Sequence, residues 1–206
     1  MPGSNIPMAA LGAWILWLGW FGFNGGSELK VSEVSSATAV SQVFLNTNMA
    51  AAGGVLTAML MSLIMTGKMD VTMAINGAIA GLVSITADPL SPSGGMAILV
   101  GAIGGAIVYF SIVFLENAGV DDPVGAISAH GTVGIFGVLA VAFTGGASFM
   151  GQLIGVLMIA GFTYLASLGT ILVINKLIMP IRASDAEQEA GLDISEVGIE
   201  AYPEFK

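Results

Sequence analysis

The single histidine of the chain, His130, is the side chain best suited to chemistry in this sequence. It follows Asp121, Asp122 and Pro123, in a stretch that is otherwise apolar as far as Thr144. An imidazole is costly to bury among apolar groups without a partner or water, and an ionisable side chain in a membrane span is a candidate functional residue. Because histidine gains and loses a proton near neutral pH, it could handle protons there. The alternative is a packed histidine that hydrogen-bonds a neighbouring carbonyl group.

The acids and the proline before His130 predict where its helix starts. Carboxylates accept the free amide protons of a first helical turn, and proline fits that turn because it has no amide proton to leave unpaired. We therefore expect the helix to begin at Pro123. In that register Gly134 and Gly137 follow His130 at i+4 and i+7, so the imidazole shares a face with two glycines that let another helix or a narrow lumen come close.

The composition is that of a polytopic membrane protein. Of 206 residues, 55% are hydrophobic and 9% are charged, and the mean hydropathy is +0.90. A soluble domain has about a quarter of its residues charged, whereas uncharged apolar runs of about 20 residues indicate transmembrane helices. Cysteine is absent and histidine occurs once, so we expect neither a metal site nor a cofactor. Seven of the fourteen acids follow Pro180, which places most of the negative charge in a tail.

Six apolar segments predict an all-α fold of six transmembrane helices, separated by polar loops that contain glycine and proline. The spans are expected at about residues 7–26, 38–66, 71–87, 95–115, 123–144 and 149–179, with an acidic cytoplasmic tail over residues 181–206. The sixth span is longer than a perpendicular helix needs, which predicts a strong tilt or an extension beyond the bilayer.

The basic residues predict the orientation. An even number of spans puts both termini on one side of the membrane, and Lys68, Lys176, Arg182 and Lys206 fall on that side, with only Lys30 opposite. The positive-inside rule then places both termini in the cytoplasm.

The first span carries every tryptophan of the chain, Trp14, Trp17 and Trp20, together with Phe21 and Phe23. One interpretation is an interfacial belt of aromatic residues. The other is a cation site, because an aromatic face attracts an ammonium-like charge by up to about 2 kcal/mol when the site is partly desolvated.

Ordered sequence blocks resemble the ammonium transporter (Amt/Mep/Rh) family over nearly the whole chain. They are Gly19–Ser27, Asn46–Asn48, Asn76–Thr86, Asp121–Gly131 and Gly191–Tyr202. The resemblance is to the C-terminal half of such transporters, meaning the second inverted repeat, the last helix and the cytoplasmic tail. It implies half of an ammonium-transporter fold.

The resemblance also implies residue roles. Trp20, Phe23 and Ser27 match residues that recruit the cation and gate the pore, His130 matches one of two pore histidines, and Thr86 matches a threonine beside the pore. The implied function is transport of ammonium or ammonia through an apolar pore. A bare ammonium ion is costly inside a bilayer and neutral ammonia is not, so an aromatic vestibule followed by an imidazole suits that task.

The implied partners are ammonium or ammonia, the lipid bilayer of the plasma (inner) membrane, a complementary N-terminal half, further copies in a trimer, and a PII-type signal protein on the cytoplasmic side. The alternative is a truncated, non-conducting subunit or a sensing module that binds full-length relatives or such a regulator. The chain departs from the family at Gly125, where an aspartate is common, and at Val197, which replaces the histidine of a histidine-glycine pair. An enzyme is not expected, because the chain offers no nucleophile and base together. Nothing in the sequence suggests a nucleic-acid partner.

Overall fold

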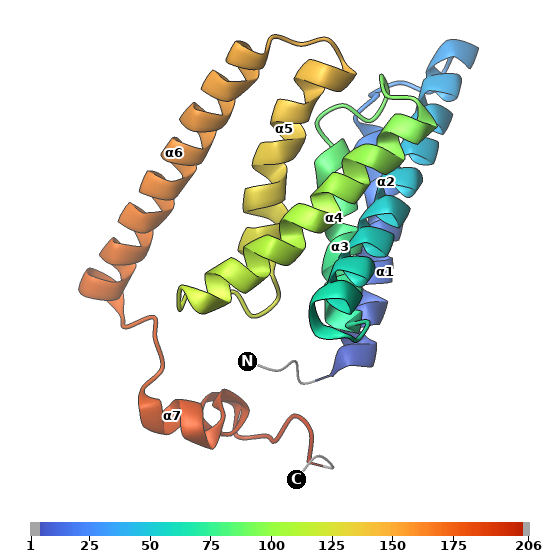
Figure 1. Cartoon of the computed structure of the whole chain (residues 1–206). Coiled ribbons are helices and arrows are strands. Elements are labelled where there is room, and N and C mark those ends of the chain that lie inside the picture. The colour runs from blue at the N-terminus through green and yellow to red at the C-terminus, as the bar shows by residue number, and fades with distance from the viewer. Residues whose placement is uncertain (1–4, 204–206) are drawn as a thin grey trace. The chain divides into compact units, whose positions relative to one another are not determined.

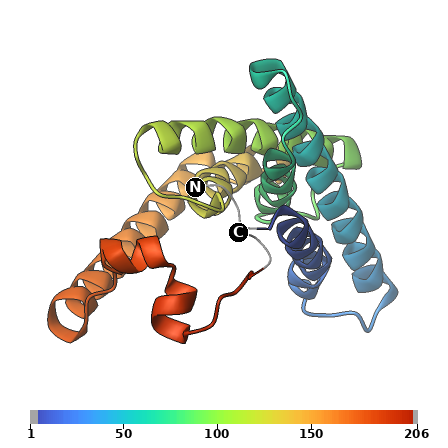
Figure 2. The same cartoon turned by 90° about the horizontal axis from the view of Figure 1, so that it is seen from below.

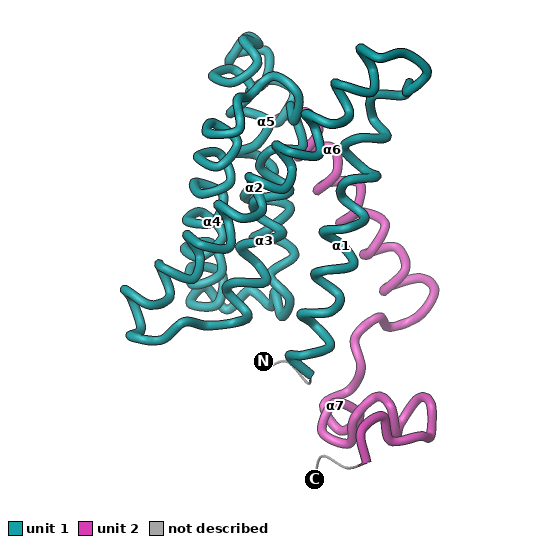
Figure 3. The backbone as a smooth tube through the Cα atoms, turned by 90° about the vertical axis from the view of Figure 1, so that its right-hand side faces the viewer, with its two compact units in different colours: residues 1–156 teal, residues 157–206 magenta. Residues whose placement is uncertain are grey.

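The computed structural model describes residues 5–203, and every regular element in that range is helical (Figure 1). The predicted all-α fold is therefore confirmed for the described residues. Lys206, which contributed to the predicted orientation, lies outside them, as do residues 1–4 and the last part of the tail. The chain divides into two compact units, residues 1–156 and residues 157–206 (Figure 3), and each is described by itself.

The first unit contains α1 (Ile6–Gly26), α2 (Val34–Thr66), α3 (Val71–Ile85), α4 (Gly94–Asn117), a π-helical segment η1 (Ile127–Thr132) and α5 (Val133–Thr144). α6 (Phe149–Val173) begins in the first unit and ends in the second, which also holds the π-helical segment η2 (Ile174–Ile178), α7 (Asp185–Ala190) and the π-helical segment η3 (Asp193–Val197).

Five helices of the described residues are long and apolar enough to cross a membrane, where six spans were expected. The helix that falls short is α3, at the third expected span. Its 15 residues rise about 22 Å, less than the roughly 30 Å of a bilayer core. Its limits have local causes. The Asp70 carboxylate accepts the amide proton of Thr72 at its start, and Pro89 follows shortly after its end.

Glycine and alanine let the helices of the first unit pack closely. α2, α3 and α4 contact one another, α1 packs on α2 and α3, and α5 packs on α3 and α4 (Figures 1 and 2). A Cβ atom on Gly54 or Gly81 would overlap the backbone of the facing helix, and Gly101 meets the backbone of Ala50 in the same way. Backbones that touch without intervening side chains are typical of membrane helix interfaces. η1, which carries His130, packs on α3 and α4 of this closely packed group.

Buried polar side chains of α2 are satisfied within the protein, as membrane burial requires. The Asn46 amide donates to the carbonyl oxygens of Pro89 and Pro92 at 2.9 and 2.7 Å. Thr47 accepts a hydrogen bond of 3.0 Å from the Asn24 amide. These bonds attach the loop after α3 and the end of α1 to α2.

The helix that carries His130 begins later than the sequence predicted. It starts with η1 at Ile127, not at Pro123, because Gly125 has a φ of +69°, a left-handed conformation that interrupts a helix. The predicted role of Asp122 as an acceptor of free amide protons is nevertheless found: its two carboxylate oxygens accept from the amides of Ile127 and Ser128 at 3.0 and 3.1 Å.

Candidate functional site

An open cavity of about 340 Å³ brings together five of the residues that the sequence singled out. Its lining residues are Trp20 and Phe23 from α1, Val83, Thr86 and Ala87 from α3 and the loop that follows, and His130, Gly134 and Val138 from η1 and α5. Apart from Trp20, Thr86 and His130, these residues carry no polar side-chain atoms. The lining of the cavity is therefore mostly apolar, with few groups that can donate or accept a hydrogen bond.

Trp20 is the residue that connects the three sides of this cavity. Its indole Nε1 donates to Thr86 Oγ1 at 2.7 Å, and its ring stacks on the imidazole of His130 with centroids 6.3 Å apart and planes inclined by 14°. The ring of Phe23 meets the indole edge-on, with centroids 5.8 Å apart. α1, α3 and η1 thus meet at a single side chain.

His130 lies on the π-helical segment, with its side chain exposed in the isolated chain. Its imidazole makes no hydrogen bond to any residue that the structure describes, so the alternative of a packed histidine held by a carbonyl group is not found. Segments of π-helix are rare and often occur at functional sites. The ring is stacked on one face, and both of its nitrogens are free to hydrogen-bond a small molecule in the cavity.

The two glycines that follow His130 have different surroundings. Gly134 lines the cavity, and a Cβ atom there would lie 3.8 Å from a methyl group of Val83, an ordinary contact. Gly137 is buried, and a Cβ atom there would lie 2.8 Å from the carbonyl oxygen of Ser84 on α3. Gly137 therefore allows the close approach of another helix that the spacing suggested, and Gly134 keeps space beside the imidazole.

Ser27 is not among the residues that line this cavity. It lies at the end of α1, exposed, and its hydroxyl donates to the Phe23 carbonyl oxygen at 2.8 Å. Conversely, Val83, Ala87 and Val138 line the cavity but were not singled out from the sequence. The helical spacing that relates His130 to Gly134 continues to Val138, so that residue could have been found; Val83 requires knowledge of the packing.

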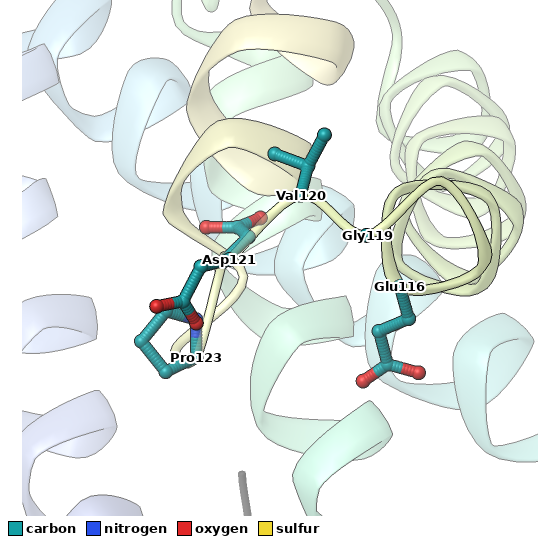
Figure 4. Close-up of a pocket in the computed structure, with 6 residues that line it drawn as sticks. Glu116, Gly119, Val120, Asp121 and Pro123 are labelled. Carbon is teal, nitrogen blue, oxygen red and sulfur yellow. The ribbon is translucent and has the colours of Figure 1, made fainter. Parts of the chain in front are cut away.

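A second cavity, of about 390 Å³, lies at the loop between α4 and η1 (Figure 4). Glu116 comes from the end of α4, whereas Asp121, Asp122 and Pro123 come from the loop. Of these acids, Asp122 bonds the amides at the start of η1. No three histidine, aspartate or glutamate side chains of residues 5–203 are grouped in a way that could hold a metal ion.

At Gly125, where the resembling family often has an aspartate, the structure shows a close contact with α3. The backbone of Gly125 lies against the side-chain oxygen of Asn76 on α3, so that a Cβ atom there would overlap it. In this chain the contact beneath the helix start is made by Asn76 and a bare backbone, without a carboxylate at position 125.

Comparison with known proteins decides the family. The model of the Ammonium Transporter Family matches residues 1–202. The chain belongs to this family. It is 38% identical over 227 residues to the ammonium transporter Amt2 of Archaeoglobus fulgidus, a match that covers 100% of the chain and 47% of that protein. It is 36% identical to the ammonium transporter Amt2 of Methanocaldococcus jannaschii, over 98% of the chain and 48% of that protein.

Solved structures agree with the sequence matches. A protein described as a Sensor Amt Protein superposes with a TM-score of 0.86 at 32% identity, over 94% of the chain and 49% of that protein. Mep2 of Candida albicans gives a TM-score of 0.78 at 26% identity, over 89% of the chain and 44% of that protein. The chain is thus an integral membrane protein of a transporter family, not of an enzyme family, and it spans about half the length of the relatives it matches.

Proposed function

We propose that the chain supplies one half of a transmembrane path for ammonium or ammonia, and that the cavity lined by Trp20, Phe23, Thr86 and His130 is one wall of that path. The observation that carries the proposal is the imidazole of His130, exposed and stacked on an indole in an otherwise apolar cavity. An ionisable ring that faced lipid would be costly, so the face that bears it is one that protein must cover.

The chemistry of the cavity suits a species that crosses as a cation outside and as a neutral molecule within. Trp20 and the ring of Phe23, which is 61% exposed, offer aromatic faces to a cation that has lost part of its water. His130 can then accept or return a proton, so that the apolar wall has to accommodate only the neutral molecule. Ser27, near Phe23 at the end of α1, would assist at the entrance.

We propose that a complementary N-terminal half covers this face. The chain spans about half the length of its relatives, which leaves room for a second part of similar size in those proteins. Resemblance to the second inverted repeat supports the C-terminal half as the part present here. We also propose assembly into a trimer in the plasma (inner) membrane, with both termini cytoplasmic.

The test is uptake of labelled methylammonium in cells that lack ammonium transporters. We expect uptake when the chain is produced together with a complementary half, and we expect His130→Ala to reduce it to background. No uptake with any complementary half, or robust uptake by the His130→Ala variant, would refute the proposal. The chain alone is the control, and it should give no uptake because its pathway is open on one side.

The second candidate is a non-conducting subunit or sensing module, and an observation on the tail favours it. α7 begins with a complete capping box: the Ser184 hydroxyl accepts from the backbone amide of Glu187, and the Glu187 carboxylate accepts from the backbone amide of Ser184. Further along the tail, the Asp193 carboxylate accepts the amide proton of Ala201 at 2.8 Å. A tail with such local order could present a defined surface to a PII-type regulator, and one structural relative is described as a sensor. Co-purification with full-length relatives or a PII-type protein, without any uptake, would favour this candidate.

A further inference from the structure

The hydroxyl of Thr86 is already occupied by two hydrogen bonds within the protein. It accepts from Trp20 Nε1 at 2.7 Å and donates to the carbonyl oxygen of Leu82, one turn earlier on α3, at 2.6 Å. A hydroxyl has a single donor, and the indole has a single donor and no acceptor. Both donors are therefore spent, and neither group can donate a hydrogen bond to a small molecule in the cavity.

We infer that Thr86 is a positioning residue: its hydrogen bond fixes the rotation of the Trp20 indole, and so the stack of that ring on His130. This inference rests on the proposed function, because it assigns a role within that pathway. The indole can offer a permeating cation only its π face, and the direction of that face is set by the bond to Thr86.

The location of Thr86 explains why it can do this. It follows the last residue of α3, where its backbone amide bonds the Val83 carbonyl oxygen at 3.2 Å, and its side chain reaches across to α1. The indole meets His130 at a centroid distance of 6.3 Å with nearly parallel planes. A rotation of the indole would expose one face of the imidazole and move the aromatic surface that a cation would contact. Displacements of about 1 Å in a preorganised site can change rates by up to about a hundredfold.

The first test is a double-mutant cycle on methylammonium uptake, with the chain produced together with a complementary half. We expect Thr86→Val to lower uptake by roughly tenfold, and Trp20→Phe at least as much, because it removes the indole face as well as the hydrogen bond. The double variant should lower uptake no further than Trp20→Phe alone, because the hydrogen bond is then already absent. Thr86→Ser keeps the hydroxyl and should recover most of the uptake. Three results would overturn the inference. The losses of the two single variants could multiply in the double variant, Thr86→Val could retain the uptake of the unchanged chain, or Thr86→Ser could be as impaired as Thr86→Val.

Thr170 provides a matched control. Its hydroxyl donates to the Ala166 carbonyl oxygen at 2.8 Å, one turn earlier on α6, in the same way that Thr86 bonds Leu82, but it accepts no indole proton. Thr170→Val should leave uptake unchanged. The amount of each variant in the membrane and its thermal unfolding are measured in parallel, so that a loss of folded protein is not read as a loss of positioning.

The second test needs no transport. The chain has three tryptophans, so nitrogen-15 labelling of tryptophan gives three indole N–H signals for the chain in detergent, and Trp20→Phe identifies one of them. We expect the Trp20 proton to exchange with solvent at least about tenfold more slowly than in Thr86→Val, and the serine variant to keep the protection. An unprotected Trp20 proton in the unchanged chain would overturn the inference. A protected proton without uptake under any condition would instead refute the proposed function, and the contact would stand without a role in transport.

Discussion

At the scale of single residues, the cavity depends on which side chains are missing as much as on those present. His130, Gly134 and Val138 follow one another at four-residue intervals along η1 and α5, and all three line the cavity. Gly134 leaves the imidazole room, whereas Gly137 lets α5 lie directly on the backbone of α3. Two glycines three residues apart therefore have different tasks, and substitution distinguishes them.

Gly137→Ala should destabilise the protein and Gly134→Ala should not. Alanine favours a helix over glycine by about 1 kcal/mol, but a Cβ atom at position 137 would lie 2.8 Å from a backbone oxygen that cannot rotate away, and overpacking typically costs about 1–3 kcal/mol. At position 134 the nearest atom is 3.8 Å away, so only the favourable effect remains. Thermal unfolding of the purified chain in detergent measures both. Equal unfolding temperatures for the two variants would contradict this packing.

At the scale of elements, the sequence predicted the helices and much of the cavity, but not the geometry of the turn that carries His130. The apolar runs and the polar loops between them were enough to predict the helices. The ordered sequence blocks were enough to single out Trp20, Phe23, Thr86 and His130. The start of η1 could not be predicted in the same way. It depends on Gly125 adopting a positive φ against Asn76, which lies about fifty residues earlier in the chain. Local helix signals at Asp121 and Pro123 cannot report such a contact.

The start of α7 should loosen in acid. Glu187 accepts hydrogen bonds from both the hydroxyl and the backbone amide of Ser184, and these bonds lower the pKa of Glu187 below its ordinary value of 4.5. A lowered pKa means that the stabilisation is fully present above pH 4.5 and is lost as the pH falls through the lower value of the folded state. We expect amide hydrogen exchange at Ser184 and Glu187 to accelerate, relative to the intrinsic rate, as the pH falls from 4.5 through the lower pKa of the folded state.

Two variants separate the cap from the charge. Ser184→Ala removes the hydroxyl that accepts from the Glu187 amide, so exchange at the Glu187 amide should already be fast near neutrality. Glu189→Gln removes a carboxylate of the same helix that makes no capping bond, and it should behave like the unchanged chain. A pH response that vanishes in Glu189→Gln but persists in Ser184→Ala would show that the capping box is not its cause.

At the scale of the whole molecule, the charges that direct insertion are few and one-sided. Lys68 lies between α2 and α3, and Lys176 and Arg182 follow α6, whereas Lys30 lies between α1 and α2, where it pairs with Glu33 at 2.6 Å. With six alternating spans, we expect the first three of these residues on the side of the termini. Because basic residues near the ends of spans favour the cytoplasmic side, the orientation is expected to be single, with both termini inside.

Single cysteines can test this orientation cleanly, since the chain has no cysteine of its own. Ser32→Cys places a thiol in the exposed loop between α1 and α2, and Glu189→Cys places one on the exposed surface of α7. On intact cells, a membrane-impermeant maleimide should label Ser32→Cys and spare Glu189→Cys; after permeabilisation it should label both. Labelling of Glu189→Cys alone on intact cells would show that the orientation is the reverse of the one expected. Partial labelling of both would show a mixture of orientations, so that an excess of four basic residues on one side over one on the other does not determine the orientation. The reversed orientation would also place Trp20 and Phe23, near the end of α1, on the cytoplasmic side, and the cation would then have to be captured from the cytoplasm.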